Sequence, residues 1–366
     1  MDKLRVIQWG TGSVGKHALR TIIEHPDYEL VGLRVYNPDK VGVDAGSLVG
    51  AHDTGVLATD STDAILELDA DAVCYNALGS TLGDSEDALN DICMLLASGK
   101  NVVSSAVEFH AYLSAERPLP RAGDNAYGRI RAACEAGDTA FFQAGINPGY
   151  TMELWPMTLA QLCRRIDRVT CTEVIDMTRY PSPHMLHAMG FGVGHDQSPM
   201  DSHFRTSIRD SPFAMGMELL TDSLNIKLDD IVYRWETAPA KAEIQVAGGT
   251  IAEGTTAAIK FGLDGFVDGE PTVIFDWIWR VSNDVAPDWP TGDSVWIAHF
   301  EGDPTIKSEL DVSTTFDSRR AVSLTVATVL LNALPKVCEA APGLYNNLSI
   351  GTHGGGYLSS KADGPG

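Results

Sequence analysis

The stretch Arg5–Gly15, RVIQWGTGSVG, decides the fold of the first half of the chain. It begins as a short apolar strand and runs directly into glycines with the spacing Gly-x-Gly-x-x-Gly. The apolar residues of Lys16–Glu24 then recur at helical spacing, and a second apolar strand follows at Leu30–Tyr36. A glycine triplet between a strand and a helix of a βαβ unit predicts a dinucleotide-binding turn, whereas the triplet alone is a weak indication.

Each glycine of this turn has its own physical role. The first permits the tight turn, the second lets a pyrophosphate approach the backbone, and the third lets the helix pack on its strand. The N-terminus of the helix then faces the phosphates. The alternative is a glycine-rich turn without a ligand. We predict that the cofactor phosphates contact the loop residues Gly10, Thr11, Gly12, Ser13, Val14 and Gly15.

The end of the second strand indicates which dinucleotide binds. Sites specific for NAD usually place Asp or Glu there, about 20 residues after the glycines, to bind the ribose 2′-hydroxyl. This chain has the neutral Asn37, with Lys40 close behind and Arg34 within the strand. A cationic rim without an acidic residue suits a 2′-phosphate, so the sequence predicts NADP. NAD is the alternative, if Asp39 binds the ribose and Lys40 is merely solvated.

Strands and helices continue to alternate up to about residue 150. Such alternation predicts an α/β fold, a Rossmann-type doubly wound and mostly parallel sheet with helices on both faces. The further elements expected are strands Ala72–Ala77, Asn101–Ser104 and Thr139–Gln143 and helices Ser85–Ser98 and Tyr127–Ala136. Ligands bind beyond the carboxyl ends of such strands. We therefore expect one crevice, holding the nicotinamide, to be lined by the three segments Ala77–Gly79, Ser104–Glu108 and Gly145–Gly149. The cofactor contacts expected in it are Ala77, Leu78, Gly79 and Asn147.

The second half has a different pattern, with strand candidates of alternating polarity from about Arg168 onward. This predicts a C-terminal α+β domain with an open mixed sheet. The strand candidates are Val169–Ile175, Ile231–Glu236, Lys241–Val246, Ala257–Leu263, Val273–Val281, Val295–Phe300 and Thr305–Val312. Trp277 and Trp279 share one face of their strand, and we expect core or interface packing there.

Two helices are predicted to begin at Ser182-Pro183 and Ser211-Pro212, where an N-cap serine precedes proline at the first helical position. The segment around His184 and His187 is expected to be a surface loop, and Gly190–Gly194 a flexible lid or plain loop. Arg319–Leu334 is expected to be a buried helix that returns the chain to the first domain. The predicted domains are therefore 1–150, a dinucleotide-binding domain to which 318–366 returns, and 151–317, a substrate-binding and dimerisation domain.

The composition excludes several classes of protein. Of the 366 residues, 27 are Lys or Arg and 49 are Asp or Glu, so the net charge is −22. This balance argues against a nucleic acid or an anionic membrane as a partner. The six scattered cysteines form no CxxC pair and the N-terminus has no leader-like segment, which predicts reduced thiols in a cytoplasmic protein. No metal site is expected, because the histidines between residues 184 and 203 lack partner ligands at a convincing spacing.

Glu108 is the candidate catalytic residue, because it directly follows a strand at the predicted cofactor crevice. A helix-cap or solvated carboxylate is the alternative, and His110 is a second candidate. The expected substrate pocket consists of Phe142, Tyr180, His184, Met185 and Phe204, whose apolar and aromatic character favours a small aliphatic or cyclic ketone.

Taken together, the segments WGTGSVG, VYNPDKVGVDAG, VVSSAVEF, GINPGYTMELWP and LLNALPKVCEAAPGL resemble one family. It is the group of native amine dehydrogenases and 2,4-diaminopentanoate dehydrogenase, whose N-terminal domain is similar to that of dihydrodipicolinate reductase. The resemblance covers most of the chain and is weak between residues 177 and 230. The His-His and Lys motif of dihydrodipicolinate reductase itself is absent.

The resemblance implies an NAD(P)-dependent enzyme that interconverts an amine with a ketone or aldehyde plus free ammonia, through an iminium that accepts hydride. The family's catalytic carboxylate corresponds to Glu108, and its members are typically homodimers joined through the C-terminal sheet. Two other functions stay open: an NADPH-dependent imine or carbonyl reductase, and a dinucleotide-binding sensor without turnover.

Overall fold

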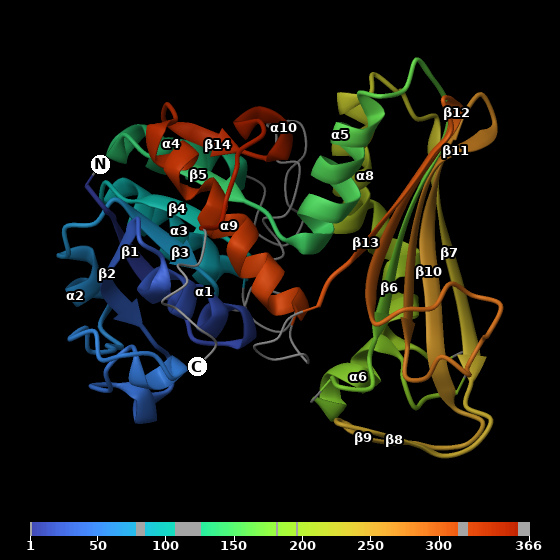
Figure 1. Ribbon diagram of the computed structural model, residues 1–366, viewed down its shortest axis with the longest axis horizontal. Coiled ribbons are helices and arrows are strands. Elements are labelled where there is room, and N and C mark those ends of the chain that lie inside the picture. The colour runs from blue at the N-terminus through green and yellow to red at the C-terminus, as the bar shows by residue number, and fades with distance from the viewer. Residues whose placement is uncertain are drawn as a thin grey trace. The chain divides into compact units, whose positions relative to one another are not determined.

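The computed structural model describes residues 2–77, 85–106, 126–180, 182–194, 197–313 and 321–357. The chain divides into two compact units (Figure 1). Unit 1 comprises Met1–Tyr150 together with Val322–Gly366, and unit 2 comprises Thr151–Ala321. Unit 1 is therefore built from two separate stretches of sequence, whereas unit 2 is continuous.

Unit 1 contains a six-stranded sheet in the order β14-β5-β4-β3-β1-β2. All its pairings are parallel, so all carboxyl ends of the strands lie at one edge of the sheet. This confirms the predicted parallel sheet. The strands are β1 (Leu4–Trp9), β2 (Tyr28–Arg34), β3 (Ala72–Tyr75), β4 (Asn101–Ser104), β5 (Ala140–Gln143) and β14 (Gly343–Tyr345).

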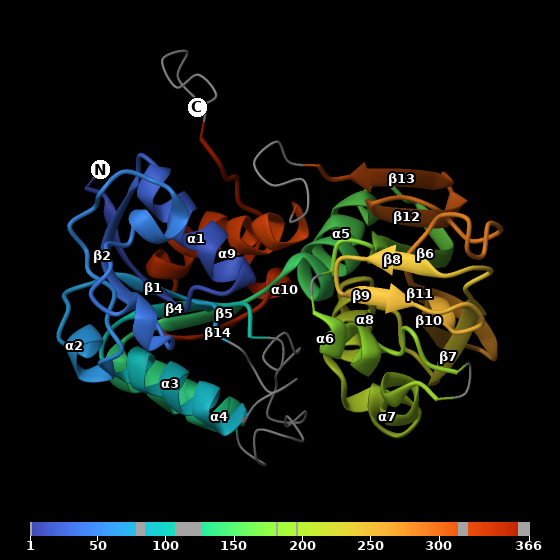
Figure 2. The same cartoon turned by 90° about the horizontal axis from the view of Figure 1, so that it is seen from below.

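Helices cover both faces of this sheet (Figure 2). One face carries α1 (Ser13–Glu24) and α9 (Ala321–Glu339), and the other carries α3 (Ser85–Ala97) and α4 (Ala126–Gly137). By length and composition α9 could cross a membrane. Its residues Ala327, Leu330, Leu331, Ala333, Leu334 and Val337 are instead fully buried in the core of unit 1. A core helix of this kind is apolar because it packs on a sheet.

Short elements and the chain end complete unit 1. They are η1 (Pro38–Lys40), η2 (Ser47–Val49), α2 (Thr62–Leu66) and α10 (Asn347–Ile350). The segment after α10 packs on α9, where the Lys336 ammonium donates to the Thr352 carbonyl at 2.6 Å and Gly356 N–H donates to Asn332 Oδ1 at 3.0 Å. At its end the Tyr357 ring meets the buried His25 ring edge-on at 5.1 Å.

Unit 2 is built on a mixed sheet in the order β13-β12-β6-β11-β10-β7, in which only the β6–β11 pairing is parallel among the described strands. This confirms the predicted α+β fold with an open mixed sheet. Its strands are β6 (Arg165–Asp176), β7 (Asp230–Pro239), β10 (Thr256–Val267), β11 (Glu270–Arg280), β12 (Ser294–Asp303) and β13 (Ile306–Asp311), and a separate hairpin consists of β8 (Ile244–Val246) and β9 (Gly249–Ile251).

One face of this sheet is aromatic and covered by helices. Trp277 is fully buried, stacks on Phe261 at 5.0 Å between ring centroids, and meets Phe213 edge-on at 4.8 Å. Trp279 and Trp296 donate their indole N–H groups to the buried carboxylate of Glu173 at 3.0 and 2.9 Å. Since Phe213 belongs to a helix, the aromatic strand face predicted from the sequence packs in a core. The helices are α5 (Trp155–Ala160), α6 (Pro183–Met189), α7 (Pro199–Ser207), η5 (Ile208–Asp210) and α8 (Pro212–Ser223).

No described helix covers the opposite face of this sheet, which we call the outer face (Figure 1). That face carries charged side chains. Arg234, on the edge strand β7, donates to Asp264 at 2.7 Å and to Asp276 at 2.8 Å. Gly262 lies between them, and a Cβ there would come within 2.6 Å of an Arg234 nitrogen. The glycine therefore lets the guanidinium lie flat on the sheet.

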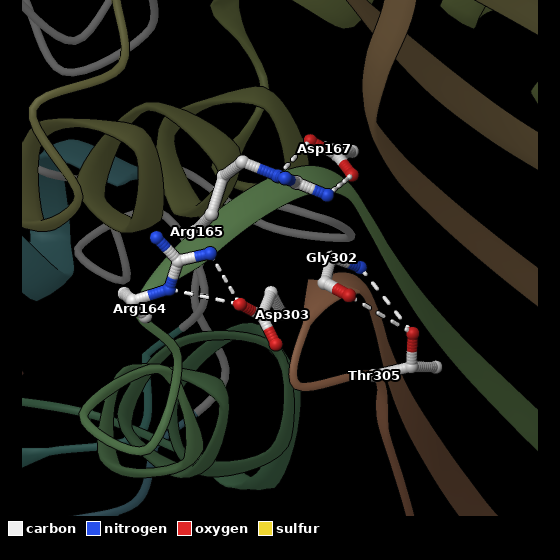
Figure 3. Close-up of polar contacts among 6 residues, drawn as sticks. All are labelled: Arg164, Arg165, Asp167, Gly302, Asp303 and Thr305. Atoms are coloured by element: carbon white, nitrogen blue, oxygen red, sulfur yellow. Dashed lines mark hydrogen bonds and ion pairs between the residues drawn. The ribbon is translucent and has the colours of Figure 1, made fainter.

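The turn between β12 and β13 is tied to the start of β6 (Figure 3). Arg164 donates from Nε to Asp303 at 2.8 Å, and its backbone N–H donates to the Asp303 carbonyl at 2.8 Å. Arg165 forms a second, bidentate pair with Asp167. These charges are exposed, and exposed pairs of this kind each contribute little to stability.

One expectation about the segment after β6 is wrong. The segment around His184 and His187 is helix α6 rather than a surface loop, and its N-cap is the predicted Ser182, which accepts from Met185 N–H at 3.3 Å. The glycine-rich stretch Gly190–Gly194 consists of turns and loop, in agreement with the plain-loop alternative, and it is anchored to the sheet. Gly192 N–H donates to the Thr256 carbonyl at 2.9 Å, and the Phe191 side chain is buried in the core of unit 2.

Candidate functional site

The glycine loop joins β1 to α1 at the carboxyl edge of the unit 1 sheet. Gly10 has φ +91°, and a Cβ there would lie 3.1 Å from the Asn76 carbonyl oxygen. A Cβ on Gly15 would lie only 2.2 Å from the Gly10 carbonyl oxygen, so the helix packs directly on the loop. At Gly12, the N-cap of α1, a Cβ would meet nothing within 4 Å. The first and third glycines are therefore required by the fold, and the second leaves open space at the helix N-terminus.

This open space has the chemistry of a phosphate site. The first N–H groups of α1 have no partners within the helix, and Gly12 supplies no side-chain cap. Such N–H groups and the helix dipole together favour an anion. Thr11 lies almost buried in the loop, while Ser13 is exposed and Val14 is half-buried. The loop therefore fits the pyrophosphate of a dinucleotide.

A buried network of amide side chains, which the sequence analysis missed, holds the glycine loop by hydrogen bonds. Gln8 donates from Nε2 to the Gly10 carbonyl at 2.8 Å and to Asn76 Oδ1 at 2.9 Å. Asn76 in turn donates to Ser105 Oγ at 2.8 Å. These bonds tie the ends of β1, β3 and β4 together. They connect the glycine loop to the chain segment that leads toward Glu108.

A cationic rim lies beside the loop, at the end of β2. Lys40 donates from Nζ to Thr11 Oγ1 at 2.8 Å, and burial together with the positive charge of Lys16 lowers the pKa of Lys40. Asn37 caps η1 by accepting from Asp39 N–H at 2.9 Å. At this position, where NAD sites usually have Asp or Glu, the chain has the neutral Asn37. Two lysines near the loop thus give this rim a positive charge.

Arg34, the last residue of β2, lies among aromatic side chains. Its guanidinium carbon is 5.5 Å from the centroid of the Trp9 ring and 4.9 Å from that of Tyr36. The Arg34 Nη1 donates to the Val35 carbonyl, while its buried Nε has no hydrogen-bond partner among the described residues. A buried donor without an acceptor is costly unless water or a ligand supplies one.

The remaining residues of the predicted crevice lie only partly within the described chain. Ala77 directly follows the end of β3, and Asn147 lies in the segment Ile146–Leu154 that begins shortly after β5. Leu78, Gly79 and the catalytic candidate Glu108 lie outside the described residues, as does His110. The parallel sheet places the ends of β3, β4 and β5 at the same edge as the glycine loop.

The residues predicted to form the substrate pocket are divided between the two units. Phe142 lies in β5 with no exposed surface and packs in the core of unit 1, so packing alone accounts for it. Phe204 of α7 packs in the aromatic core of unit 2, 5.7 Å from the Phe213 ring and 5.8 Å from Phe261. The other three candidates lie in or just before α6: His184 is exposed, Met185 is half-buried, and Tyr180 is half-buried with a pKa raised by burial.

No group of three or more His, Cys, Asp or Glu side chains suited to a metal ion occurs within the described ranges. His203 of α7 bonds instead to Ser207 Oγ, 3.0 Å from its Nε2. All six cysteines are free.

Comparisons with known proteins agree with this architecture. Residues 150–353 match the family model of the 2,4-diaminopentanoate dehydrogenase C-terminal domain. An amine dehydrogenase from Streptomyces virginiae is 33% identical over 359 residues, which is 95% of this chain and 96% of that protein. Among solved structures, an amine dehydrogenase from Mycobacterium smegmatis superposes with a TM-score of 0.71 at 18% identity, covering 93% of this chain and 94% of that one. A probable dehydrogenase from Thermotoga maritima reaches a TM-score of 0.56 at 11% identity, covering 95% of this chain and 92% of that one.

The identity to an amine dehydrogenase along nearly the whole chain, together with the matching family model, shows that the protein is an oxidoreductase. More narrowly, the chain belongs to the family of amine dehydrogenases and 2,4-diaminopentanoate dehydrogenases. The resemblance seen in the sequence is confirmed.

Proposed function

We propose that this protein is an NADP-dependent amine dehydrogenase that reductively aminates a small ketone or aldehyde with ammonia and, in reverse, oxidatively deaminates the amine. One observation in the structure supports this proposal most strongly. The Gln8–Asn76–Ser105 network joins the glycine loop to the chain just beyond β4, with hydrogen bonds of 2.9 and 2.8 Å. Ser105 is three residues before Glu108. The candidate carboxylate thus follows a segment bonded to the proposed cofactor loop.

The chemistry assigned to Glu108 is proton handling. Ammonium dominates at neutral pH, but only neutral ammonia attacks a carbonyl carbon. A carboxylate can take the proton from ammonium and return it to the carbinolamine hydroxyl, which leaves as water. Ionised again, the carboxylate then stabilises the iminium cation that remains. Bound NADPH supplies the hydride. In this proposal the protein positions the substrate, excludes water from it and balances the charge of the iminium. One glutamate is enough for the proton transfer and the charge balance.

The preference for NADP is part of the same proposal. It is supported by the positive rim formed by Lys40, Lys16 and Arg34, and by the neutral Asn37 at the position where NAD sites place an acid. A 2′-phosphate would find charged donors there, whereas the 2′-hydroxyl of NAD would find no carboxylate at that residue. Fluorescence titration with both reduced cofactors measures the preference. Clearly tighter NADH binding would reject this charge argument.

The test of the catalytic proposal is Glu108→Gln, which keeps the size of the side chain but cannot accept a proton or balance an iminium. We expect unchanged NADPH affinity, an unchanged melting temperature, and a loss of ammonia-dependent turnover of about 10²- to 10⁴-fold. The matched control is Glu253→Gln, an exposed carboxylate of unit 2, which should leave turnover unchanged. Reductive amination within a few-fold of wild type in Glu108→Gln would make the assignment wrong.

A panel of carbonyl compounds, assayed with and without ammonia by nicotinamide absorbance, separates the rival functions. Turnover that requires ammonia supports amine dehydrogenation. NADPH oxidation without ammonia would instead indicate a carbonyl reductase, and oxidation only with preformed cyclic imines would indicate an imine reductase. Tight NADPH binding without hydride transfer to any compound would indicate a sensor.

We also propose a cytoplasmic homodimer joined through the outer face of unit 2. That face carries both signs of charge, with Arg234 beside Asp264 and Asp276 and with Lys260 3.5 Å from Glu236. A two-fold interface brings the same patch against itself, so a patch of mixed sign can complement its own copy. Light scattering should give about twice the chain mass of 39.3 kDa at micromolar concentration. A monomer mass there would contradict this proposal.

A further inference from the structure

Tyr36 is an exposed aromatic side chain in an unusual position. Its exposed fraction is 56%, and it lies two residues beyond the end of β2, at the carboxyl edge of the unit 1 sheet. The end of β2 is bonded to the glycine loop, since Gly10 N–H donates to the Arg34 carbonyl at 2.9 Å. In sheets of this type the strand that follows the phosphate loop carries the residues nearest the adenosine ribose.

The Tyr36 ring is held in place despite its exposure. Its hydroxyl accepts from the indole N–H of the fully buried Trp9 at 2.8 Å and lies 3.4 Å from the Asp91 carboxylate on α3. Tyr75 donates to the same Asp91 oxygen at 3.2 Å. An exposed ring usually rotates freely, but here three elements fix the hydroxyl end. A ring fixed in advance loses little conformational entropy when a ligand packs on it.

One face of the ring is already occupied. The Arg34 guanidinium lies over it, with the carbon 4.9 Å from the ring centroid. The exposed surface of Tyr36 therefore belongs to its other face and edge. The unsatisfied Arg34 Nε lies in the same group, so a polar acceptor is still missing here among the described residues. A flat ligand could stack on the open side of the ring, and an anionic substituent on it would be attracted by the guanidinium charge behind the ring.

We propose that Tyr36 is the stacking platform for the adenine ring of the dinucleotide, backed by the Arg34 guanidinium, whose remaining donors face the 2′-phosphate. This inference rests on the proposed dinucleotide-binding function and identifies how its adenosine half is recognised. Bases stack on aromatic rings irrespective of their hydrogen-bonding edges, and a guanidinium behind the ring leaves its other face free for the base.

The experiment compares Tyr36→Leu with Tyr36→Phe. Both variants lose the hydroxyl that accepts from Trp9, but only the leucine variant loses the ring. The probes are adenosine 2′,5′-bisphosphate, which lacks nicotinamide, and reduced nicotinamide mononucleotide, which lacks adenine. Tyr357→Leu is the matched control, because Tyr357 is also exposed, at 46%, but packs against His25 in the C-terminal segment.

By calorimetric titration, Tyr36→Leu should bind the bisphosphate about 5- to 100-fold more weakly than wild type, which is the range expected for base stacking. Its affinity for the mononucleotide should not change, and Tyr36→Phe and Tyr357→Leu should bind both probes within about two-fold of wild type. In turnover assays the KM for NADPH should rise in Tyr36→Leu while kcat stays constant.

Wild-type affinity of Tyr36→Leu for the bisphosphate would overturn the inference. An equal loss in Tyr36→Phe would overturn it too, since the hydroxyl anchor rather than the ring would then matter. If Tyr36→Leu weakens bisphosphate binding as expected but the wild type shows no ammonia-dependent turnover, the proposed reductive amination is wrong while the stacking role of Tyr36 is still supported.

Discussion

Replacing the second and third glycines of the loop by alanine should separate folding from cofactor binding. A Cβ on Gly15 would lie 2.2 Å from the Gly10 carbonyl oxygen and 2.8 Å from its carbon, below the 3.0 Å that real Cβ atoms respect. Both are backbone atoms, so neither can rotate away. A Cβ on Gly12 would meet nothing within 4 Å, and φ there is −76°, which suits alanine.

These distances set the expected magnitudes. Overpacking costs about 1 to 3 kcal/mol, and the rigid contact at Gly15 puts Gly15→Ala near 3 kcal/mol. For a unit of this size that free energy lowers the melting temperature by about 6 to 12 °C. Gly12→Ala loses only a preferred N-cap residue, about 1 kcal/mol or less. It fills the space proposed for the pyrophosphate, however, and should weaken NADPH binding at least about tenfold, or 1.4 kcal/mol.

Thermal unfolding followed by circular dichroism, without cofactor, measures the first effect, and NADPH fluorescence titration measures the second. The expected pattern is a stable Gly12→Ala protein that binds poorly and a destabilised Gly15→Ala protein. Full NADPH affinity in Gly12→Ala would show that the pyrophosphate does not approach the helix there. An undiminished melting temperature in Gly15→Ala would refute the steric argument.

Two further predictions concern single side chains of unit 1. Burial lowers the pKa of His25, which stacks on Tyr28 at 4.3 Å, so protonation favours the unfolded chain and stability should fall as the pH drops below 6.5. His25→Phe keeps the stacked ring without the charge, so its melting temperature should fall less than that of wild type between pH 7.5 and 5; an equal fall in both would exclude His25 as the cause. Asn37→Asp can still cap η1, but its charge repels a 2′-phosphate and accepts from a 2′-hydroxyl, so the NADPH to NADH affinity ratio should drop. An unchanged ratio would mean that Asn37 does not face the ribose.

The parallel sheet of unit 1 could be predicted because each of its signals is local. The strand Leu4–Trp9, the glycines and the apolar face of α1 follow one another within the first 24 residues. The end of β2 was placed two residues too late, at Tyr36 instead of Arg34. Strand β2 ends where its pairing with β1 ends, because Trp9 lies opposite Arg34. The pattern of apolar residues in the sequence does not show where this pairing stops.

The starts of α6 and α8 in unit 2 could be predicted from the sequence, because apolar residues follow the N-cap serine and proline in both. Ser198-Pro199 has the same signature as the two predicted starts, and Ser198 accepts from Asp201 N–H at 3.2 Å, yet α7 was missed. Met200 and Phe204 are the only large apolar side chains of α7, and neither is fully buried, so the sequence offers too few apolar positions there to show a helical period. The amide network of Gln8, Asn76 and Ser105 was missed for another reason. Its members are 68 and 29 residues apart, and single polar residues in strands carry no pattern.

The split composition of unit 1 has a consequence for biosynthesis. Strand β14 borders β5, and α9 fills one face of the unit 1 core, but both are encoded after the whole of unit 2. On the ribosome the first 150 residues must wait while Thr151–Ala321 is made, which takes on the order of 10 to 30 s. During that time one edge of the nascent sheet, and the part of one apolar face that α9 later covers beside α1, have no cover from their own chain. The continuous unit 2 can complete its core first, so it finishes folding before unit 1 does. A chaperone that shields the incomplete sheet of unit 1 would act in that interval.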